Sequence, residues 1–363
     1  AVSNRSYRVS GGALKKKNQE LYLKRNQFRV WLWRAALAFV ATIVSLGLAE
    51  AGLRHFCGAP FGTPYVEENP NTIYSSKALT SGRQWFPGEY DYIFHTNSKG
   101  LRGRDSPYAR TGKHRILCIG DSFTFGIGAG DEESWPVQLE KRLNFAGPDS
   151  YETINAGVMG WGLAEYLVWM QMEGWRYKPD VVVMAVHAND WENALNGLFT
   201  LNEAGELERH TVVRKDIAVL KNATRYIPCY NLLMTHSALA NHLKLLVVAL
   251  SGKGASQPVR VAPGGTASLD AFSRTLSLNK AIFSGLRLAA QRMGARLIWV
   301  YIPRYYALKP ETDLKPASSL FMQERFASRF RETLFRWGEE TDDVFMDMTP
   351  IFRHILARSQ MDA

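Results

Sequence analysis

Residues 116–126 of this chain read ILCIGDSFTFG, and this stretch is the strongest indicator of fold in the sequence. Its apolar residues predict a buried β-strand that ends at the Gly-Asp-Ser triplet, with a helix beginning soon afterwards. Ser122 would then expose its hydroxyl at the carboxyl edge of a sheet, beside backbone amides that can stabilise an oxyanion. The triplet alone is a weak signal, because Asp and Ser are also ordinary residues at the start of a helix.

Two further strand ends strengthen the functional interpretation. Residues 155–162 read NAGVMGWG, a glycine-rich turn after the next predicted strand, and residues 187–190 read HAND after the third. Successive parallel strands end at the same edge of a sheet, so Ser122, Gly160 and Asn189 would meet there as a nucleophile and two oxyanion donors. The alternative is that each residue serves only the geometry of its own turn.

The rest of the chain alternates short apolar strands with helical stretches. We expect strands at residues 115–119, 152–155, 180–186, 296–302 and 344–348, and helices at residues 135–144, 162–174, 268–293 and 318–337. This alternation predicts a parallel sheet that helices cover on both faces. The sequence therefore predicts an α/β fold with three layers and a flavodoxin-like, five-stranded parallel sheet.

Taken together, these motifs resemble the SGNH, or GDSL-like, hydrolase superfamily. GDSFTFG matches its first block, Asn-Ala-Gly-Val-Met-Gly resembles its second, and His-Ala-Asn-Asp resembles its third. Residues 96–102, TNSKGLR, also look like those of membrane-tethered members. The resemblance covers roughly residues 90–195 and implies Ser122 as nucleophile, with Gly160 and Asn189 as oxyanion donors. It implies ester or thioester chemistry without a cofactor, and leaves the substrate open.

The chain departs from the family at the general base. The last block of the family is Asp-x-x-His, which supplies the base and its orienting carboxylate, and a serine hydroxyl is a poor nucleophile without a base. None of the eight histidines has an Asp three residues before it. His187, beside Asn189, and His354, seven residues after Asp347, are weak candidates for the role. Either the natural protein continues past Ala363 into this block, or the domain has lost its base.

The N-terminal segment reads as a membrane anchor. Residues 1–34 contain nine basic residues and one acid, so most of the net charge of +10 belongs to this segment. An uncharged run from Ala35 to Leu48 follows, and its flanks extend it to a predicted transmembrane helix at residues 31–54. The competing interpretation is a cleaved signal peptide, because residues 49–51 resemble a signal-peptidase site.

The charge distribution predicts the topology and the partners of the chain. The positive-inside rule predicts that residues 1–30 form a basic cytoplasmic tail and that the helix spans a bacterial-type inner membrane. The main domain would then lie on the other side of this membrane, in the periplasm. Residues 55–114 read as an extended connector and flap, and residues 115–363 as the SGNH-like domain, with an insertion at about 191–267. We expect contact with membrane lipid through the helix, and no nucleic-acid binding, because little net charge remains outside the tail.

The three cysteines have no metal-ligand spacing, so the sequence predicts no metal site. Cys118 lies inside a predicted strand and reads as a buried thiol. Cys57 and Cys229 would be able to pair in an oxidising compartment, and the sequence leaves that pairing open.

Two functions fit these observations. The first is a membrane-anchored serine ester hydrolase or acyl transferase that acts on acyl groups of an envelope glycan or lipid. The second is a catalytically inactive SGNH-like subunit, an accessory or scaffold protein within a larger membrane protein complex. The Ser122 turn favours the first, and the missing base favours the second.

Overall fold

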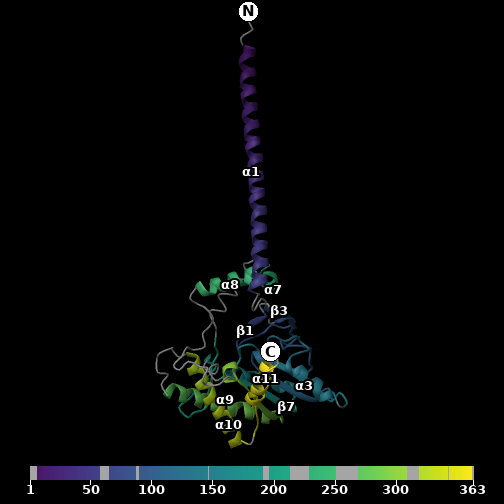
Figure 1. Ribbon diagram of the computed structural model, residues 1–363, viewed down its shortest axis with the longest axis vertical. Coiled ribbons are helices and arrows are strands. Elements are labelled where there is room, and N and C mark those ends of the chain that lie inside the picture. The colour runs from purple at the N-terminus through teal and green to yellow at the C-terminus, as the bar shows by residue number, and fades with distance from the viewer. Residues whose placement is uncertain are drawn as a thin grey trace, which may run out of the picture. The chain divides into compact units, whose positions relative to one another are not determined.

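A computed structural model describes residues 6–57, 65–86, 90–145, 147–190, 196–212, 229–250, 269–308, 319–341 and 343–361. The chain divides into two units, residues 1–58 and residues 59–363. The first unit contains helix α1 (Ser6–Phe56), which is continuous through the segment predicted to span the membrane (Figure 1). Its part from Lys24 to Phe56 is long and apolar enough to cross a membrane.

The second unit is built around five parallel strands. They are β5 (His114–Gly120), β6 (Tyr151–Gly157), β7 (Val181–His187), β10 (Arg296–Ile302) and β11 (Val344–Asp347). Their order across the sheet is β6-β5-β7-β10-β11. Numbered along the chain this is 2-1-3-4-5, the order of flavodoxin-like sheets. The predicted fold class is confirmed, and every predicted strand is present.

Helices cover both faces of the sheet because successive side chains of each strand point to opposite faces. Leu117 and Ile119 of β5 face the larger core, which includes α4 (Leu163–Met172), α9 (Leu269–Arg292) and α10 (Ser319–Thr341). Ile116 and Cys118 face α3 (Trp135–Asn144) on the other side. These two cores make the three layers that the alternating pattern predicted.

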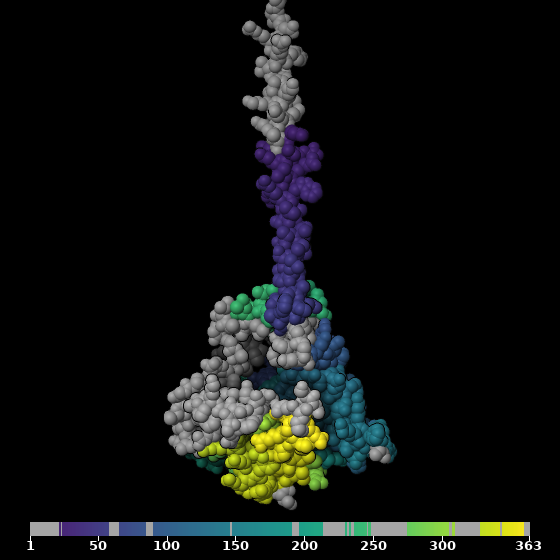
Figure 2. Space-filling view, viewed as in Figure 1, coloured from purple at the N-terminus to yellow at the C-terminus, as the bar shows by residue number. Residues whose placement is uncertain are grey.

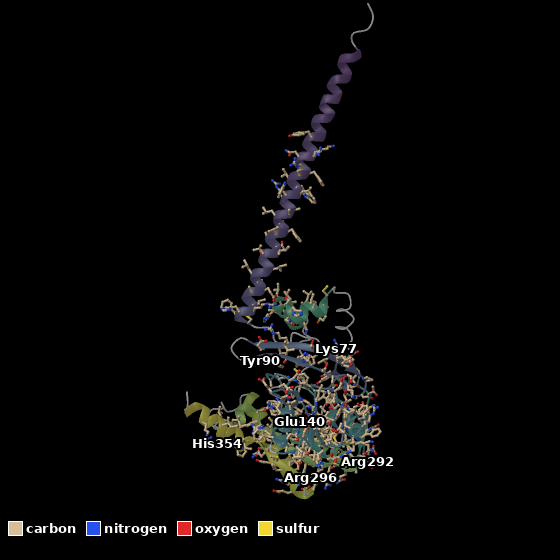
Figure 3. The ribbon with its side chains drawn as sticks, turned by 90° about the vertical axis from the view of Figure 1, so that its right-hand side faces the viewer. Lys77, Tyr90, Glu140, Arg292, Arg296 and His354 are labelled. Carbon is tan, nitrogen blue, oxygen red and sulfur yellow. The ribbon has the colours of Figure 1, made fainter. Side chains whose placement is uncertain are left out.

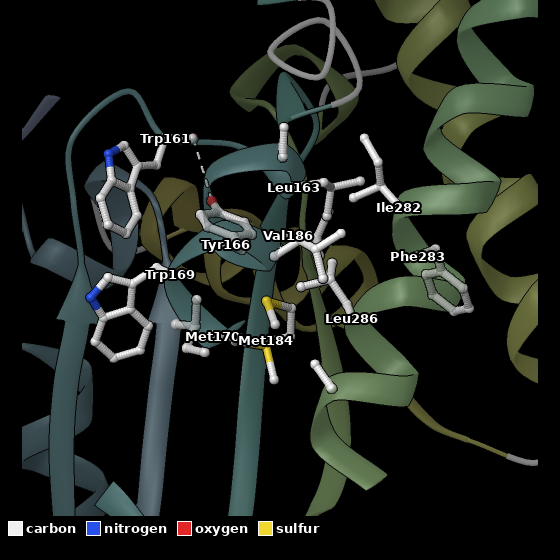
Figure 4. Packing of buried hydrophobic residues seen from close by; sticks show 14 of the residues in the cluster. Trp161, Leu163, Tyr166, Trp169, Met170, Met184, Val186, Ile282, Phe283 and Leu286 are labelled. Carbon is white, nitrogen blue, oxygen red and sulfur yellow. Dashed lines mark hydrogen bonds between the residues drawn. The ribbon is translucent and has the colours of Figure 1, made fainter. Parts of the chain in front are cut away.

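The larger core is dense around α4. All eight residues from Leu163 to Met170 are buried, as expected for a helix that packs between a sheet and α9 (Figure 4). On the neighbouring strand β10, the Trp299 ring stacks on Phe283 of α9, with ring centroids 4.3 Å apart. Each buried side chain of this size contributes about 1.5–3 kcal/mol, so this core is the main source of stability for the unit.

The predicted connector contains two antiparallel hairpins. The first pairs β1 (Val66–Asn69) with β2 (Ile73–Ser76), and the second pairs β3 (Ser81–Phe86) with β4 (Tyr90–His95). Tyr65, Tyr92 and Phe94 bury their rings against Phe125, which lies just after the Gly-Asp-Ser turn. The hairpins therefore pack on the predicted site.

The predicted insertion, residues 191–267, is described only in part. It holds a short hairpin of β8 (Phe199–Leu201) and β9 (Leu207–Arg209), and two helices, α7 (Tyr230–His236) and α8 (Ala238–Leu250). Residues 230–250 thus form two helices that are separated at Ser237. The chain is completed by α2 (Ser122–Phe125), η1 (Gly174–Tyr177), η3 (Tyr305–Leu308) and α11 (Thr349–Met361).

The C-terminal segment, in yellow, forms part of the surface of the second unit (Figure 2). Cys118 is buried, as predicted, and Cys57 and Cys229 are exposed free cysteines.

Candidate active site

The first strand of the sheet delivers Ser122 to the carboxyl edge. β5 ends at Gly120, and Asp121 caps the single-turn helix α2 by accepting a hydrogen bond from the Phe123 backbone N–H at 2.9 Å. Asp121 is buried while Ser122 is partly exposed. The turn therefore presents the serine at the surface and keeps its neighbouring carboxylate inside.

The glycine-rich turn after β6 lies directly against this serine turn. The Val158 N–H donates to the Gly120 carbonyl at 3.0 Å. A Cβ atom on Gly157 would lie 2.1 Å from the Phe125 nitrogen, so only glycine permits this approach. Gly160 has a φ of 77°, the left-handed conformation that favours glycine, and it is exposed at the sheet edge.

The third strand, β7, brings His187 and Asn189 to the same edge. The Asp190 carboxylate holds this turn, because its Oδ2 atom accepts from the His187 backbone N–H at 3.0 Å and from the Tyr166 hydroxyl at 3.2 Å. The His187 ring stacks on Phe123 at 4.4 Å between ring centroids. Its Nδ1 atom lies 2.6 Å from Asn189 Oδ1. Ser122, Gly160 and Asn189 therefore follow three neighbouring strands of one sheet edge.

Burial sets the protonation of the groups under this edge. Burial raises the pKa of Asp121 to about 6, opposed by hydrogen bonds that include one from the Ser122 side chain. Burial, helped by the charge of Asp121, also raises the pKa of Asp190 well above its usual range. Burial lowers the pKa of His187 to about 4, so its imidazole is neutral at pH 7. A neutral ring beside buried carboxyl groups is the electrostatic state of the site.

The two candidate bases differ in their positions. His187 belongs to the site, with its Nδ1 atom 3.9 Å from Asp121 Oδ2. His354 lies on α11 with an exposed side chain (Figure 3). In the parts of the chain that the structure describes, no hydrogen bond joins Ser122 to either histidine. The described residues also contain no group of three or more His, Cys, Asp or Glu side chains that would hold a metal ion.

Two residues outside the predicted set support the site. The Arg102 guanidinium is buried and donates to the backbone carbonyls of Phe125 and Gly126, at 2.5 and 2.6 Å. The Tyr74 carbonyl accepts from the Trp161 indole N–H at 2.9 Å, next to Gly160. Arg102 belongs to the TNSKGLR stretch, which the sequence analysis singled out. No residue near Tyr74 in the sequence predicts its contact with the glycine turn.

Several solved structures are similar to this chain. One is TesA, at 16% identity and a TM-score of 0.33, covering 64% of this chain and 76% of that one. Another is a putative lipolytic protein of the G-D-S-L family from Desulfitobacterium hafniense, at 13% identity and a TM-score of 0.32, covering 65% of this chain and 78% of that one. A third is an acetylxylan esterase from Geobacillus stearothermophilus, at 16% identity and a TM-score of 0.36, covering 69% of this chain and 83% of that one.

No family model matches the chain, and no curated protein matches it. Identities and TM-scores this low carry no argument, so the resemblance to the SGNH superfamily rests on the strand order and the motifs of this chain.

Proposed function

We propose that the chain is a membrane-anchored serine ester hydrolase or acyl transferase that works outside the cytoplasm. The observation that carries the proposal is the position of Ser122, Gly160 and Asn189 after three neighbouring parallel strands, β5, β6 and β7. This arrangement has one nucleophile and two oxyanion donors at a single sheet edge, which acyl transfer requires.

In the proposed reaction, the Ser122 hydroxyl oxygen bonds to the carbonyl carbon of an ester. The Gly160 and Ser122 backbone amides and the Asn189 side-chain amide donate to the oxyanion that forms. The serine proton passes to a base and then to the departing alcohol, and water or a second alcohol takes up the acyl group from Ser122. In the family the base belongs to an Asp-x-x-His block, and residues 1–363 contain no such block.

The substrate class that we propose is an O-acyl group on a glycan or lipid of the cell envelope. The feature that supports it is the apolar helix α1, with the basic residues that precede its apolar part. The positive-inside rule would place the domain in the periplasm.

The test is hydrolysis of p-nitrophenyl acetate by the purified, full-length natural protein. Ser122→Ala should abolish hydrolysis, because it removes the nucleophile without changing the turn. Ser284→Ala is the matched control, since Ser284 is an exposed serine on α9. Equal rates for the wild type and Ser122→Ala would refute the proposal.

A second candidate is an inactive accessory subunit of a membrane protein complex. The observation that favours it is that no hydrogen bond joins Ser122 to His187 or His354 among the described residues. The exposed leucines of α7 and α8, Leu232, Leu243 and Leu246, offer a surface for a partner. Extraction in mild detergent and native electrophoresis would test it, and migration as a lone monomer would count against it.

A further inference from the structure

The contact between His187 and Asn189 fixes which way the Asn189 side chain faces. A carboxamide oxygen only accepts hydrogen bonds, so the 2.6 Å contact between His187 Nδ1 and Asn189 Oδ1 requires the proton on Nδ1. With its oxygen held by the ring, the amide presents its NH₂ group away from His187. The nearby Asp121 Oδ2, 3.9 Å from Nδ1, also favours a proton on that nitrogen.

The His187 ring is itself held in place. It stacks on Phe123 at an interplanar angle of 27°, its side chain is 11% exposed, and its backbone N–H is bound by Asp190. The charged groups that face it are Asp121 and Arg304, and burial keeps it neutral. A ring with so little freedom is able to orient a neighbouring side chain.

We propose that His187 is a positioning residue, which turns the Asn189 carboxamide so that its NH₂ group donates to the oxyanion of the acyl-transfer reaction. This inference rests on the proposed function of Ser122. The terminal torsion of an Asn side chain has two broad orientations, and only one of them points a donor at the substrate. The hydrogen bond from Nδ1 removes the unproductive orientation before the substrate binds, which is the preorganisation that oxyanion stabilisation needs.

This role differs from that of a general base. A base would have to accept the Ser122 proton, and the group that works best has a pKa near the operating pH. Nδ1 already carries a proton that it donates to Asn189. The burial of the ring also opposes the charged form that proton transfer would create.

Kinetics of the full-length protein on p-nitrophenyl acetate test the proposal. His187→Leu keeps the bulk on Phe123 and removes the donor, and kcat should fall about 10- to 100-fold with KM within about 2-fold, because one oxyanion donor is worth about 10²–10³ in kcat. His187→Asn places an amide donor near the position of Nδ1 and should recover most of the loss. The double variant His187→Leu/Asn189→Ala should be no slower than Asn189→Ala, because both changes disable the same donor.

A measurement independent of activity is the tautomer of His187, by ¹⁵N NMR of the histidine-labelled protein in detergent. We expect a protonated Nδ1 and an unprotonated Nε2 in the wild type, and a loss of this preference in Asn189→Ala. A protonated Nε2 in the wild type would overturn the proposal, and so would a His187→Leu variant with unchanged Ser122-dependent kcat. No Ser122-dependent hydrolysis at all would overturn the proposed function and the catalytic role of His187, while the tautomer would still decide whether the hydrogen bond exists.

Discussion

Arg102 is the most informative residue to perturb, because its buried guanidinium ties the segment after the two hairpins to the loop after Ser122. Its side chain is 1% exposed. It donates to the carbonyls of Phe125, Gly126 and Ala129 and to the Asp131 carboxylate, at 3.0 Å in the last case. Arg102→Met keeps most of the side-chain volume and removes all of these donors.

The expected loss follows from which acceptors water can reach. Phe125 and Gly126 are buried, so water would not replace the lost donor. The Phe125 carbonyl would lose its partner at about 1–2 kcal/mol, and the Gly126 carbonyl would lose about 1 kcal/mol or less, because it still accepts from the Ala129 N–H at 3.2 Å. Asp131 is 23% exposed and also pairs with His95, so its loss adds less than about 1 kcal/mol. We expect Arg102→Met to lower the free energy of unfolding by about 2–4 kcal/mol. Arg102→Lys should recover only part of this, because an ammonium cannot serve several acceptors in a fork.

The assay is denaturant unfolding of the full chain in mild detergent, followed by tryptophan fluorescence. Arg104→Met is the matched control, since Arg104 is two residues away and 61% exposed, with its guanidinium on Glu140 at 2.6 Å. The control should lose less than about 1 kcal/mol. If Arg102→Met lowers the free energy of unfolding by no more than Arg104→Met does, Arg102 does not hold the loop as we describe.

Two further changes test the glycine turn and the buried acid beneath it. Gly160→Ala places a Cβ atom 2.6 Å from the Tyr74 hydroxyl at a φ of 77°. Denaturation should therefore show a larger loss in the free energy of unfolding than Gly103→Ala does, because Gly103 has a φ of 92° and open space around the added Cβ atom. The left-handed backbone alone costs about 1–2 kcal/mol, and equal losses would mean that Tyr74 does not crowd this turn. Burial raises the pKa of Glu165 from 4.5 to about 8, so the folded state keeps a proton that the unfolded state releases, and stability falls as pH rises through this window. Glu165→Gln should remove up to about 1.4 kcal/mol per pH unit of that fall, measured as the free energy of unfolding at two pH values in the window. Glu203→Gln, at an exposed position, is the control, and the same dependence of unfolding free energy on pH in both variants would contradict a protonated Glu165.

The sheet was predictable because its strands are buried on both faces. Such strands read as continuous apolar runs, as in residues 181–186 of β7, and the alternation with helices determines that they run parallel. Parallel strands then bring their carboxyl ends to one edge, which is why Ser122, Gly160 and Asn189 were predicted as neighbours. Local pattern and global topology agree here, so the sequence alone carried the inference.

The two hairpins of residues 66–95 were not predictable in the same way. Strands β1, β2 and β3 are short and carry polar residues, so they show no apolar period of two, and only β4 has alternating aromatic residues. What stabilises them is contact with distant residues: Tyr65 and Phe94 pack on Phe125, and the Trp161 indole binds the Tyr74 carbonyl. A pattern within one segment contains no record of such partners.

The role of His187 was likewise not predictable from the sequence, because it depends on a single hydrogen bond. The HAND turn places a histidine two residues before the candidate oxyanion donor, and that spacing suits a base, an orienting donor or an ordinary turn residue equally well. The contact between Nδ1 and Asn189 Oδ1 identifies an orienting donor, because the carboxamide oxygen can only accept and Nδ1 therefore donates. Nε2 is the only ring nitrogen left to accept a proton, and burial makes the resulting cation costly. If Ser122 reacts, its proton passes either to Nε2 of His187 against this cost or to another residue.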